Sequence, residues 1–189
     1  KAKELGYKGI ILPESNAAEA AVVNGIEVLG AMDIMQVIKF LNNEEDITPF
    51  NIDIEKDFYS KQSDFHFDFS EVRGQESVKR AFEVAAAGGH NLIMVGPPGS
   101  GKSMMAKRLP SILPPLTLQE SLETTKIHSV AGKIGGHKSF ITTRPFRAPH
   151  HTMSFAGLVG GGASPCPGEI SLAHNGVLFL DELAEFDKR

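Results

Sequence analysis

The sequence predicts an α/β fold, in which a three-layer αβα module follows the end of a smaller α/β domain. Short apolar runs alternate with helical patterns in the first 43 residues. Farther along, an apolar run at residues 91–95 leads into a glycine-rich loop and a helix, and a second apolar run at residues 177–180 ends in two acidic residues. Buried strands that end in such turns are typical of sheets covered by helices.

Residues 1–43 contain the first α/β pattern. Residues 9–12 and 26–29 are short apolar runs typical of strands, and Ile34, Val37 and Leu41 follow the spacing of a helical face, together with Met35 and Ile38. About 43 residues are too few for an independent α/β domain. We therefore interpret this part as the C-terminal end of a domain that begins upstream.

Residues 44–69 are acidic and aromatic, and they predict a linker. Nine acidic residues stand against two lysines between Glu44 and Glu71. Phe65, Phe67 and Phe69 alternate as in a strand, so the segment is expected to dock on a neighbouring domain rather than to be fully solvated.

Residues 70–189 carry the larger module. Its elements follow from apolar spacing, from Gly88 and Pro110 as stop signals, and from a capping box formed by Thr117 and Glu120. A stretch rich in glycine and proline, at residues 132–168, is expected to form loops with short elements. The predicted elements are a helix at 76–87, a strand at 91–95, a helix at 102–109, a helix from 118 to about 128, and a strand at 177–180.

Composition excludes several classes of protein. The single cysteine, Cys166, allows no internal disulfide and no zinc framework, which fits a reducing cytoplasm. No apolar run approaches the roughly 18 residues of a membrane-spanning helix, so no membrane partner is expected. The net charge of −4 conceals a basic excess after residue 72, where 13 basic residues face 9 acidic ones.

The glycine-rich loop satisfies the P-loop pattern GxxxxGK[ST]. Glycines let backbone N–H groups turn toward the phosphates of a nucleotide, and a following helix adds the positive end of its dipole. Lys102 would neutralise the β- and γ-phosphates of ATP, and the Ser103 hydroxyl would ligate Mg²⁺. The motif consists of Gly96, Pro97, Pro98, Gly99, Ser100, Gly101, Lys102 and Ser103.

The second apolar run, residues 177–180, ends in Asp181 and Glu182. This arrangement is the Walker B pattern, which is weak alone and informative beside a P-loop. Asp181 would hold Mg²⁺, and Glu182 would act as the general base for the attacking water. The acidic pair favours a hydrolase over a small-molecule kinase.

Four sequence boxes resemble the bacterial magnesium-chelatase-like AAA+ ATPases related to the competence protein ComM, also called the YifB type. The likeness covers about residues 69–189. It implies a P-loop AAA+ fold that binds ATP and Mg²⁺, with Val72 and Gln75 beside the adenine, and a hexameric ring in the full-length form. The boxes are FSEVRGQ at 69–75, AAAGGHN at 85–91, RPFRAPHHT at 144–152 and PGEISLAHNGVLFLDE at 167–182.

The same resemblance bears on both ends of the chain. The N-terminal part is similar to the end of a Lon-protease-like domain, whose catalytic dyad would lie upstream. A complete AAA+ module would continue beyond Arg189 with a sensor strand, an arginine finger and a helical lid, and a later strand would separate the Walker A and Walker B strands. We therefore expect a truncated module with an open sheet that binds nucleotide without efficient turnover.

The substrate of the motor stays open between two classes. A ring-forming motor on DNA is the first hypothesis, and a motor that remodels a protein partner is the alternative; a nucleotide-binding fragment without motor activity is a third. Arg144 and Arg147 are either contacts to DNA phosphates or ordinary surface charges. His150 and His151 are expected in a substrate loop or a hydrogen-bonded turn, with contact to DNA as the alternative. The two adjacent histidines would point to opposite faces of a strand and make a poor metal pair.

Overall fold

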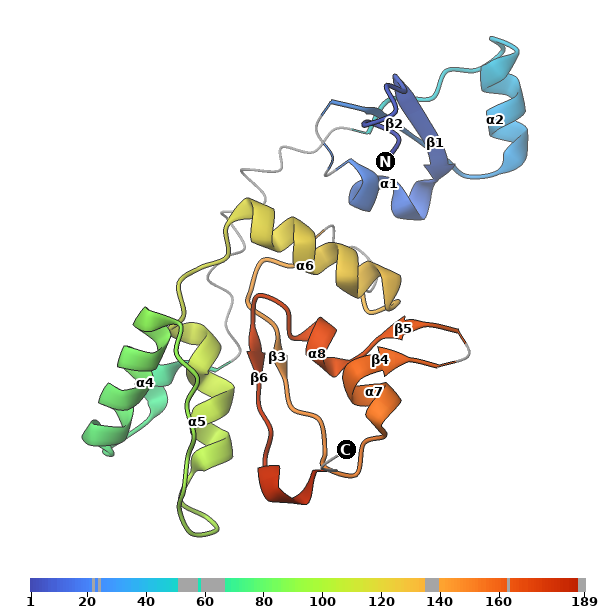
Figure 1. Ribbon diagram of the computed structural model, residues 1–189. Helices are drawn as coiled ribbons and strands as arrows, with labels where there is room; N and C mark the ends of the chain where they lie inside the picture. The colour runs from blue at the N-terminus through green and yellow to red at the C-terminus, as the bar shows by residue number, and fades with distance from the viewer. Residues whose placement is uncertain are drawn as a thin grey trace. The chain divides into compact units, whose positions relative to one another are not determined.

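The computed structural model describes residues 1–21, 23, 25–50, 58, 67–134, 140–162 and 164–186, except for the side chain of Glu19. The chain divides into two compact units. Unit 1 comprises residues 1–60 and 134–141, and unit 2 comprises residues 61–133 and 142–189. Both units mix helices with short strands, which confirms the α/β class (Figure 1).

Unit 1 is built on a strand-helix-strand unit. β1 (Gly9–Pro13) pairs in parallel with β2 (Glu27–Ala31), and α1 (Glu14–Ala20) connects them. A Cβ at Gly30 would lie 3.0 Å from the Cβ of the fully buried Ala17, so a glycine there lets α1 lie close to β2. The two strands predicted from apolar runs are confirmed.

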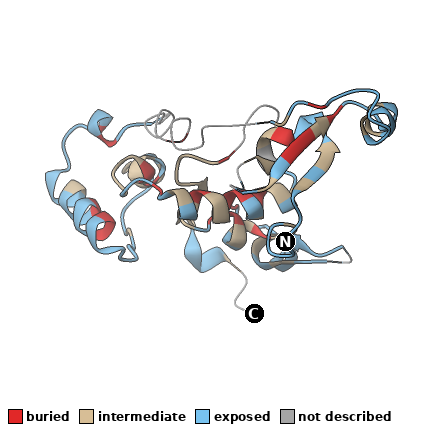
Figure 2. Ribbon diagram, turned by 90° about the horizontal axis from the view of Figure 1, so that it is seen from above, coloured by how far each residue is buried: buried red, intermediate tan, exposed pale blue. Residues whose placement is uncertain are grey.

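α2 (Ile34–Leu41) forms the predicted helix of unit 1 and begins at Asp33, whose side chain accepts a 2.9 Å hydrogen bond from the Gln36 amide. Val37 and Phe40 pack against the buried side chains of Leu29, Ala31 and Ile47. No residue of α2 is itself buried (Figure 2). Most of its predicted apolar face is therefore exposed, namely Ile34, Met35, Ile38 and Leu41.

Much of the predicted linker, residues 51–57 and 59–66 including Phe65, lies outside the described residues. Phe58 is buried and its ring centroid lies 6.0 Å from that of Phe140. The predicted strand alternation at Phe67 and Phe69 is wrong, because Phe69 begins a 3-10 turn, η1 (Phe69–Glu71). Asp68 caps this turn by accepting a hydrogen bond from the Ser70 amide, a local interaction that strand periodicity does not detect.

Unit 2 contains most of the helices and the remaining strands (Figure 1). The predicted capping box is confirmed at the start of α6, where Thr117 and Glu120 exchange hydrogen bonds of 3.2 Å and 2.8 Å. In chain order after η1, the elements are α4 (Glu76–Gly88), α5 (Lys102–Arg108), η2 (Leu109–Ser111), α6 (Leu118–Val130), β3 (Phe146–Arg147), α7 (Phe155–Val159), β4 (Gly160–Gly161), β5 (Cys166–Pro167), α8 (Glu169–Leu172), β6 (Val177–Leu178) and η3 (Leu183–Glu185).

A small apolar core joins η1 and α4 to α5. Phe69, Val72, Phe82 and Met105 are buried together, and the rings of Phe69 and Phe82 lie 5.6 Å apart. Met94, Leu109 and Ile112 pack against this cluster. The core thereby fixes the helix that follows the glycine-rich loop.

The sheet of unit 2 that bears on the site consists of β3 and β6, which pair in parallel with Phe146 opposite Val177. The amides of Val177 and Phe179 donate 2.8 Å hydrogen bonds to the carbonyls of Pro145 and Arg147. A Cβ at Gly176 would collide with the Pro145 carbonyl, so only glycine permits this close approach. The last predicted strand thus exists but is shorter than residues 177–180.

The strand predicted at residues 91–95 is not formed. Residues 91–97 have no regular secondary structure, and the side chains of Ile93 and Val95 are 79% and 93% exposed. A strand needs a neighbour to bond with, and among the described residues β6 pairs with β3 and not with this segment. A cavity of about 290 Å³ separates it from β6, lined by Leu92 and Met94 on one side and by Val177 and Phe179 on the other. The three-layer arrangement therefore stays a prediction.

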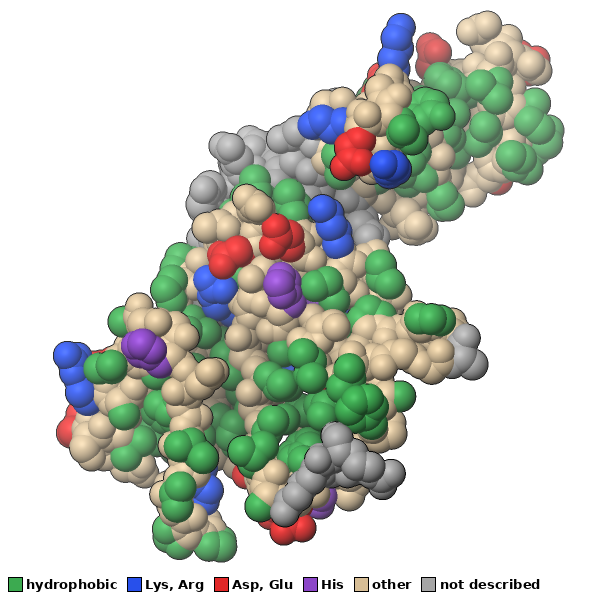
Figure 3. Space-filling model, in the orientation of Figure 1, with side chains coloured by type: hydrophobic (Ala, Val, Ile, Leu, Met, Phe, Trp, Pro, Cys, Tyr) green, Lys and Arg blue, Asp and Glu red, His purple; other side chains and the backbone are tan. Residues whose placement is uncertain are grey.

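Hydrophobic side chains gather on the surface over α7 and α8 (Figure 3). Phe155, Val159 and Ile170 are among the exposed apolar residues of these helices. β4 and β5 form a short antiparallel hairpin beside them and carry the exposed Cys166. None of the described helices is long and apolar enough to span a membrane.

Candidate functional site

The glycine-rich loop runs from Gly96 to the start of α5, and its glycines allow the observed turn. Gly99 and Gly101 have φ angles of +78° and +86°, which other residues adopt only with strain. A Cβ at Gly99 would meet no atom within 4 Å, so this side of the loop is open. Gly101 is the N-cap of α5 and makes no side-chain cap to the first amides of the helix, which are the kind of donors that bind anions at helix N-termini.

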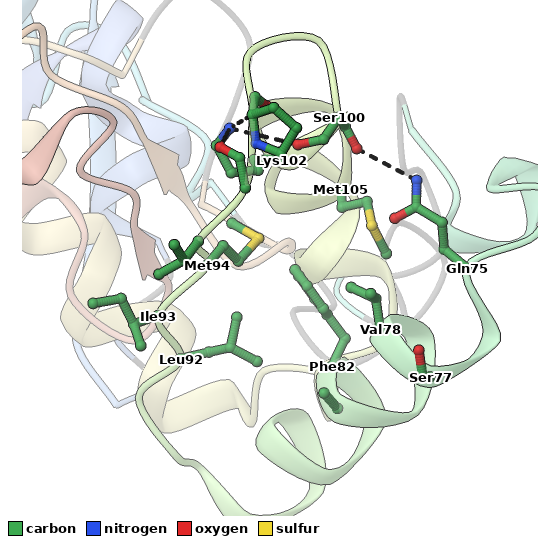
Figure 4. A pocket seen from close by; sticks show the side chains of 14 residues that line it. Gln75, Ser77, Val78, Phe82, Leu92, Ile93, Met94, Ser100, Lys102 and Met105 are labelled. Atoms are coloured by element: carbon green, nitrogen blue, oxygen red, sulfur yellow. Dashed lines mark hydrogen bonds between the residues drawn. The ribbon is translucent and has the colours of Figure 1, made fainter.

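Lys102 folds back over the loop that precedes it (Figure 4). Its Nζ donates hydrogen bonds of 2.9 Å and 3.0 Å to the carbonyls of Gly96 and Pro97, and a longer one of 3.5 Å to Ser100 Oγ. These acceptors are neutral. Phosphate oxygens form stronger, charge-assisted hydrogen bonds, so a bound phosphate can replace them.

Ser103 and Asp181 bring the two predicted motifs together. Ser103 Oγ donates a 2.8 Å hydrogen bond to Asp181 Oδ2, across 78 positions of sequence. Oδ1 of the same carboxylate accepts a 3.2 Å hydrogen bond from the Glu182 amide. A hydroxyl and a carboxylate oxygen are the hard ligands that Mg²⁺ prefers, so this donor set fits the expected metal.

Glu182 follows directly and has a left-handed backbone, with φ of +54°. Its Oε2 lies 3.1 Å from His151 Nδ1. The sequence placed His151 in a loop or a DNA contact and missed this pair. The signal that was available is the convergence of the carboxyl ends of neighbouring parallel strands, since β3 leads to His151 and β6 to Glu182.

Gln75 and Val72 occupy different places in the structure. Gln75 lines a cavity of about 410 Å³ beside the loop, and its Nε2 donates a 3.4 Å hydrogen bond to the Ser100 carbonyl (Figure 4). Val72 is buried in the core beneath. Most of the cavity wall is apolar, as a nucleobase requires; it includes Val78, Ala81, Phe82, Leu92, Met94 and Met105.

The segment that carries Val72 is fastened to the helix of the P-loop. Glu71 Oε2 accepts hydrogen bonds of 2.6 Å and 3.1 Å from the Arg108 guanidinium at the end of α5. The Phe69 amide donates to Ser111 Oγ at 2.9 Å. Three hydrogen bonds therefore connect this segment to the end of α5 and to η2.

Arg144 and Arg147 are bound to protein groups within unit 2. Arg144 donates to the carbonyls of Pro114 at 2.6 Å and Asn175 at 2.7 Å. Arg147 makes a two-pronged ion pair with Glu169, with one bond of 2.6 Å. These hydrogen bonds lower the pKa of the Glu169 carboxyl and raise that of the guanidinium.

His150 and His151 lie at a hydrogen-bonded turn, which is one of the places expected for them, and not in a strand; the Met153 amide donates a 2.9 Å hydrogen bond to the His150 carbonyl. Their ring centroids are 4.2 Å apart. His150 Nδ1 lies 2.8 Å from Thr152 Oγ1. Among the described residues, no group of three or more His, Cys, Asp or Glu side chains could hold a metal ion.

Comparison with known proteins agrees with this arrangement. The family described as "Magnesium chelatase, subunit ChlI" matches residues 68–189. The chain is 43% identical to competence protein ComM of Haemophilus influenzae over all of its length, which covers 37% of that relative. It is 44% identical to the uncharacterized protein YifB of Escherichia coli, over 95% of this chain and 34% of the relative.

An uncharacterized protein of Mycobacterium tuberculosis is 45% identical over 97% of the chain and 36% of its own length. The chain thus spans about a third of the length of the curated relatives that it matches. The family match covers well over half of the chain and includes both motifs of the site. The chain therefore belongs to the magnesium-chelatase-like family of ComM and YifB, described as magnesium chelatase, subunit ChlI.

Proposed function

We propose that this chain is the nucleotide-binding part of an AAA+ ATPase that uses ATP and Mg²⁺. One observation carries the proposal: the 2.8 Å hydrogen bond between Ser103 and Asp181 unites the P-loop with the acidic end of β6. Each motif alone occurs in many contexts. Together at this distance they form the oxygen donor set that a nucleotide-bound Mg²⁺ requires.

The chemistry follows from the residues around this pair. Lys102 binds the β- and γ-phosphates in place of the loop carbonyls, while backbone amides at the start of α5 hold phosphate oxygens. Ser103 and Asp181 would hold Mg²⁺, which neutralises charge on the phosphates when bound. Glu182 accepts the proton of the attacking water. The adenine base of ATP lies in the cavity beside Gln75 and Val78.

For the full-length protein we propose a motor that acts on DNA as a ring, expected to be a hexamer. The likeness to competence protein ComM supports this choice. Arg144 and Arg147 do not supply the DNA contacts, because both are bound to protein groups. A motor acting on a protein partner is the alternative outcome of the experiment below.

The domain limits belong to the same proposal. We place the end of a Lon-protease-like domain at residues 1–43, a linker at 44–69 and the ATPase part at 70–189. The strand-helix-strand unit of β1, α1 and β2 supports α/β organisation in the first of these. We also propose that the chain from Lys1 to Arg189 alone binds ATP without efficient turnover.

ATP hydrolysis by the full-length protein, with and without single-stranded and branched DNA, tests the proposal. We expect DNA to raise the rate at low salt and the effect to fall with rising salt, because phosphate contacts release counterions. If the hydrolysis rate does not respond to DNA but rises with a protein partner, the substrate of the motor is a protein and not DNA. The absence of ATP binding would refute the ATPase itself.

A further inference from the structure

The pair formed by His151 and Glu182 connects two segments that are distant in sequence. His151 lies four residues beyond β3, and Glu182 lies four residues beyond β6. Because β3 and β6 are parallel neighbours, both turns leave the same edge of the sheet. There Nδ1 of His151 and Oε2 of Glu182 are 3.1 Å apart.

The histidine is the better fixed partner of the two. Its side chain is 27% exposed, whereas that of Glu182 is 65% exposed. The His151 ring lies 4.2 Å from the His150 ring and meets the Phe186 ring edge-on at 6.5 Å. His150 is held in turn by Thr152, whose hydroxyl and amide lie 2.8 Å and 3.3 Å from its Nδ1.

The acidic turn is also shaped around this ring. η3 (Leu183–Glu185) carries the chain from Glu182 to Phe186, so the carboxylate and the phenyl ring reach the same histidine from both ends of one turn. The left-handed backbone of Glu182 sets its direction, and its amide is bound to Asp181. Asp181 thus fixes the backbone of Glu182, and His151 fixes its carboxylate.

We propose that His151 is a positioning residue for Glu182, holding Oε2 through an Nδ1–H donor so that Oε1 stays directed at the attacking water. A carboxylate oxygen can only accept, so Nδ1 carries the shared proton. An exposed glutamate otherwise samples several rotamers, and each wrong rotamer removes the base from its water. This inference rests on the proposed ATPase function and assigns a residue outside both nucleotide-binding motifs.

The test compares four single variants and one double variant of the full-length protein with wild type, measuring the ATP Kd with Mg²⁺ and the kcat for hydrolysis. His151→Ala removes the donor, whereas His151→Asn keeps an N–H on the atom bonded to Cγ, where Nδ1 stood. Glu182→Gln removes the base. His174→Ala is the matched control, because His174 is an exposed histidine near Glu123, away from the site.

We expect His151→Ala to lower kcat about tenfold or more with an unchanged Kd, and His151→Asn to restore most of the rate. His174→Ala should match wild type, and the double variant His151→Ala/Glu182→Gln should be no slower than Glu182→Gln alone. The inference is overturned if kcat of His151→Ala is unchanged or raised, or if His151→Asn is as slow as His151→Ala. It is also overturned if the double variant is slower than Glu182→Gln by the factor that His151→Ala alone loses.

Failure of the inference can be told apart from failure of the proposed function. If Glu182→Gln abolishes hydrolysis while His151→Ala does not slow it, only the role of His151 is wrong. If Glu182→Gln hydrolyses ATP like wild type, the general base is assigned wrongly; the roles of Glu182 and His151 both fall, while the ATPase activity stands. If the wild type binds no ATP, the proposed function falls.

Discussion

Ser103 Oγ donates a 2.8 Å hydrogen bond to Oδ2 of Asp181, which joins the first turn of α5 to the acidic end of β6. The fold therefore brings these two oxygen ligands together. Much less reorganisation is then needed when Mg²⁺ and a nucleotide bind.

The first prediction concerns this pair. Ser103→Ala removes one Mg²⁺ ligand and leaves Lys102 and the loop amides in place. We expect the affinity for ATP with Mg²⁺ to fall about tenfold, as the loss of one polar contact to a charged group implies, while metal-free binding changes little. Titration of a fluorescent ATP analogue with and without Mg²⁺ measures both. Ser164→Ala, at an exposed serine, is the control; equal losses in the two titrations would show that Ser103 acts on the fold and not on the metal.

The second prediction separates two residues that sequence placed together beside the adenine. Val72→Ala truncates a buried side chain and should lower the free energy of unfolding by about 2 kcal/mol. Gln75→Ala should leave stability nearly unchanged and weaken ATP binding, because Gln75 lines the cavity and holds the Ser100 carbonyl. Denaturant unfolding and nucleotide titration of both variants measure the difference. If instead Val72→Ala weakened ATP binding and Gln75→Ala lowered the free energy of unfolding, the adenine would lie elsewhere.

The third prediction is that Arg144 stabilises the fold and does not contact DNA. Its side chain is 15% exposed and binds the carbonyls of Pro114 and Asn175. Arg144→Gln removes the guanidinium and its charge and should cost about 2 kcal/mol of stability. The salt dependence of DNA binding, measured on folded full-length protein, should stay as in wild type. Lys126→Ala, at an exposed lysine of α6, is the control for charge loss. A shallower salt slope in Arg144→Gln alone would restore Arg144 as a phosphate contact.

The fourth prediction concerns acid stability. The hydrogen bonds from Arg147 hold the pKa of Glu169 below its ordinary value of 4.5, as hydrogen bonds from Thr117 and the charge of Arg144 do for Glu120. The unfolded chain therefore binds more protons than the folded one in this range, so stability rises with pH there. The contribution is complete above pH 4.5 and is lost as the pH falls through the lowered pKa values. Chemical unfolding between pH 3 and 6 measures this contribution. Glu169→Gln should flatten the dependence of stability on pH, whereas the control Glu4→Gln, at an exposed acid of unit 1, should not. An unchanged slope in Glu169→Gln would contradict the assignment.

Local patterns predicted the elements whose causes are local. The start of α6 follows from Thr117 and Glu120, which are three positions apart, and α4 ends near Gly88 and Gly89 because Gly89 adopts a left-handed backbone. The P-loop and the acidic pair were identified from their spacing alone, and the structure brings Ser103 and Asp181 into contact.

Features that depend on distant partners were not predictable in the same way. The strand at residues 91–95 has the right composition but no neighbour to pair with among the described residues. Arg147 looked like a surface charge because its partner Glu169 is 22 positions away. His151 and Glu182 meet only because β3 and β6 pair in parallel, a relation that the sequence alone did not specify.

The central claim is that the loop from Gly96 to Ser103 binds the phosphates of ATP through Lys102. Calorimetric titration of ATP with Mg²⁺ into the wild type and Lys102→Ala tests it most directly, with Lys107→Ala, at an exposed lysine on the same helix, as the control. We expect the wild type and Lys107→Ala to bind ATP alike, and Lys102→Ala to show no binding while its unfolding transition is unchanged. A Lys102→Ala variant that binds ATP with wild-type affinity would contradict this account.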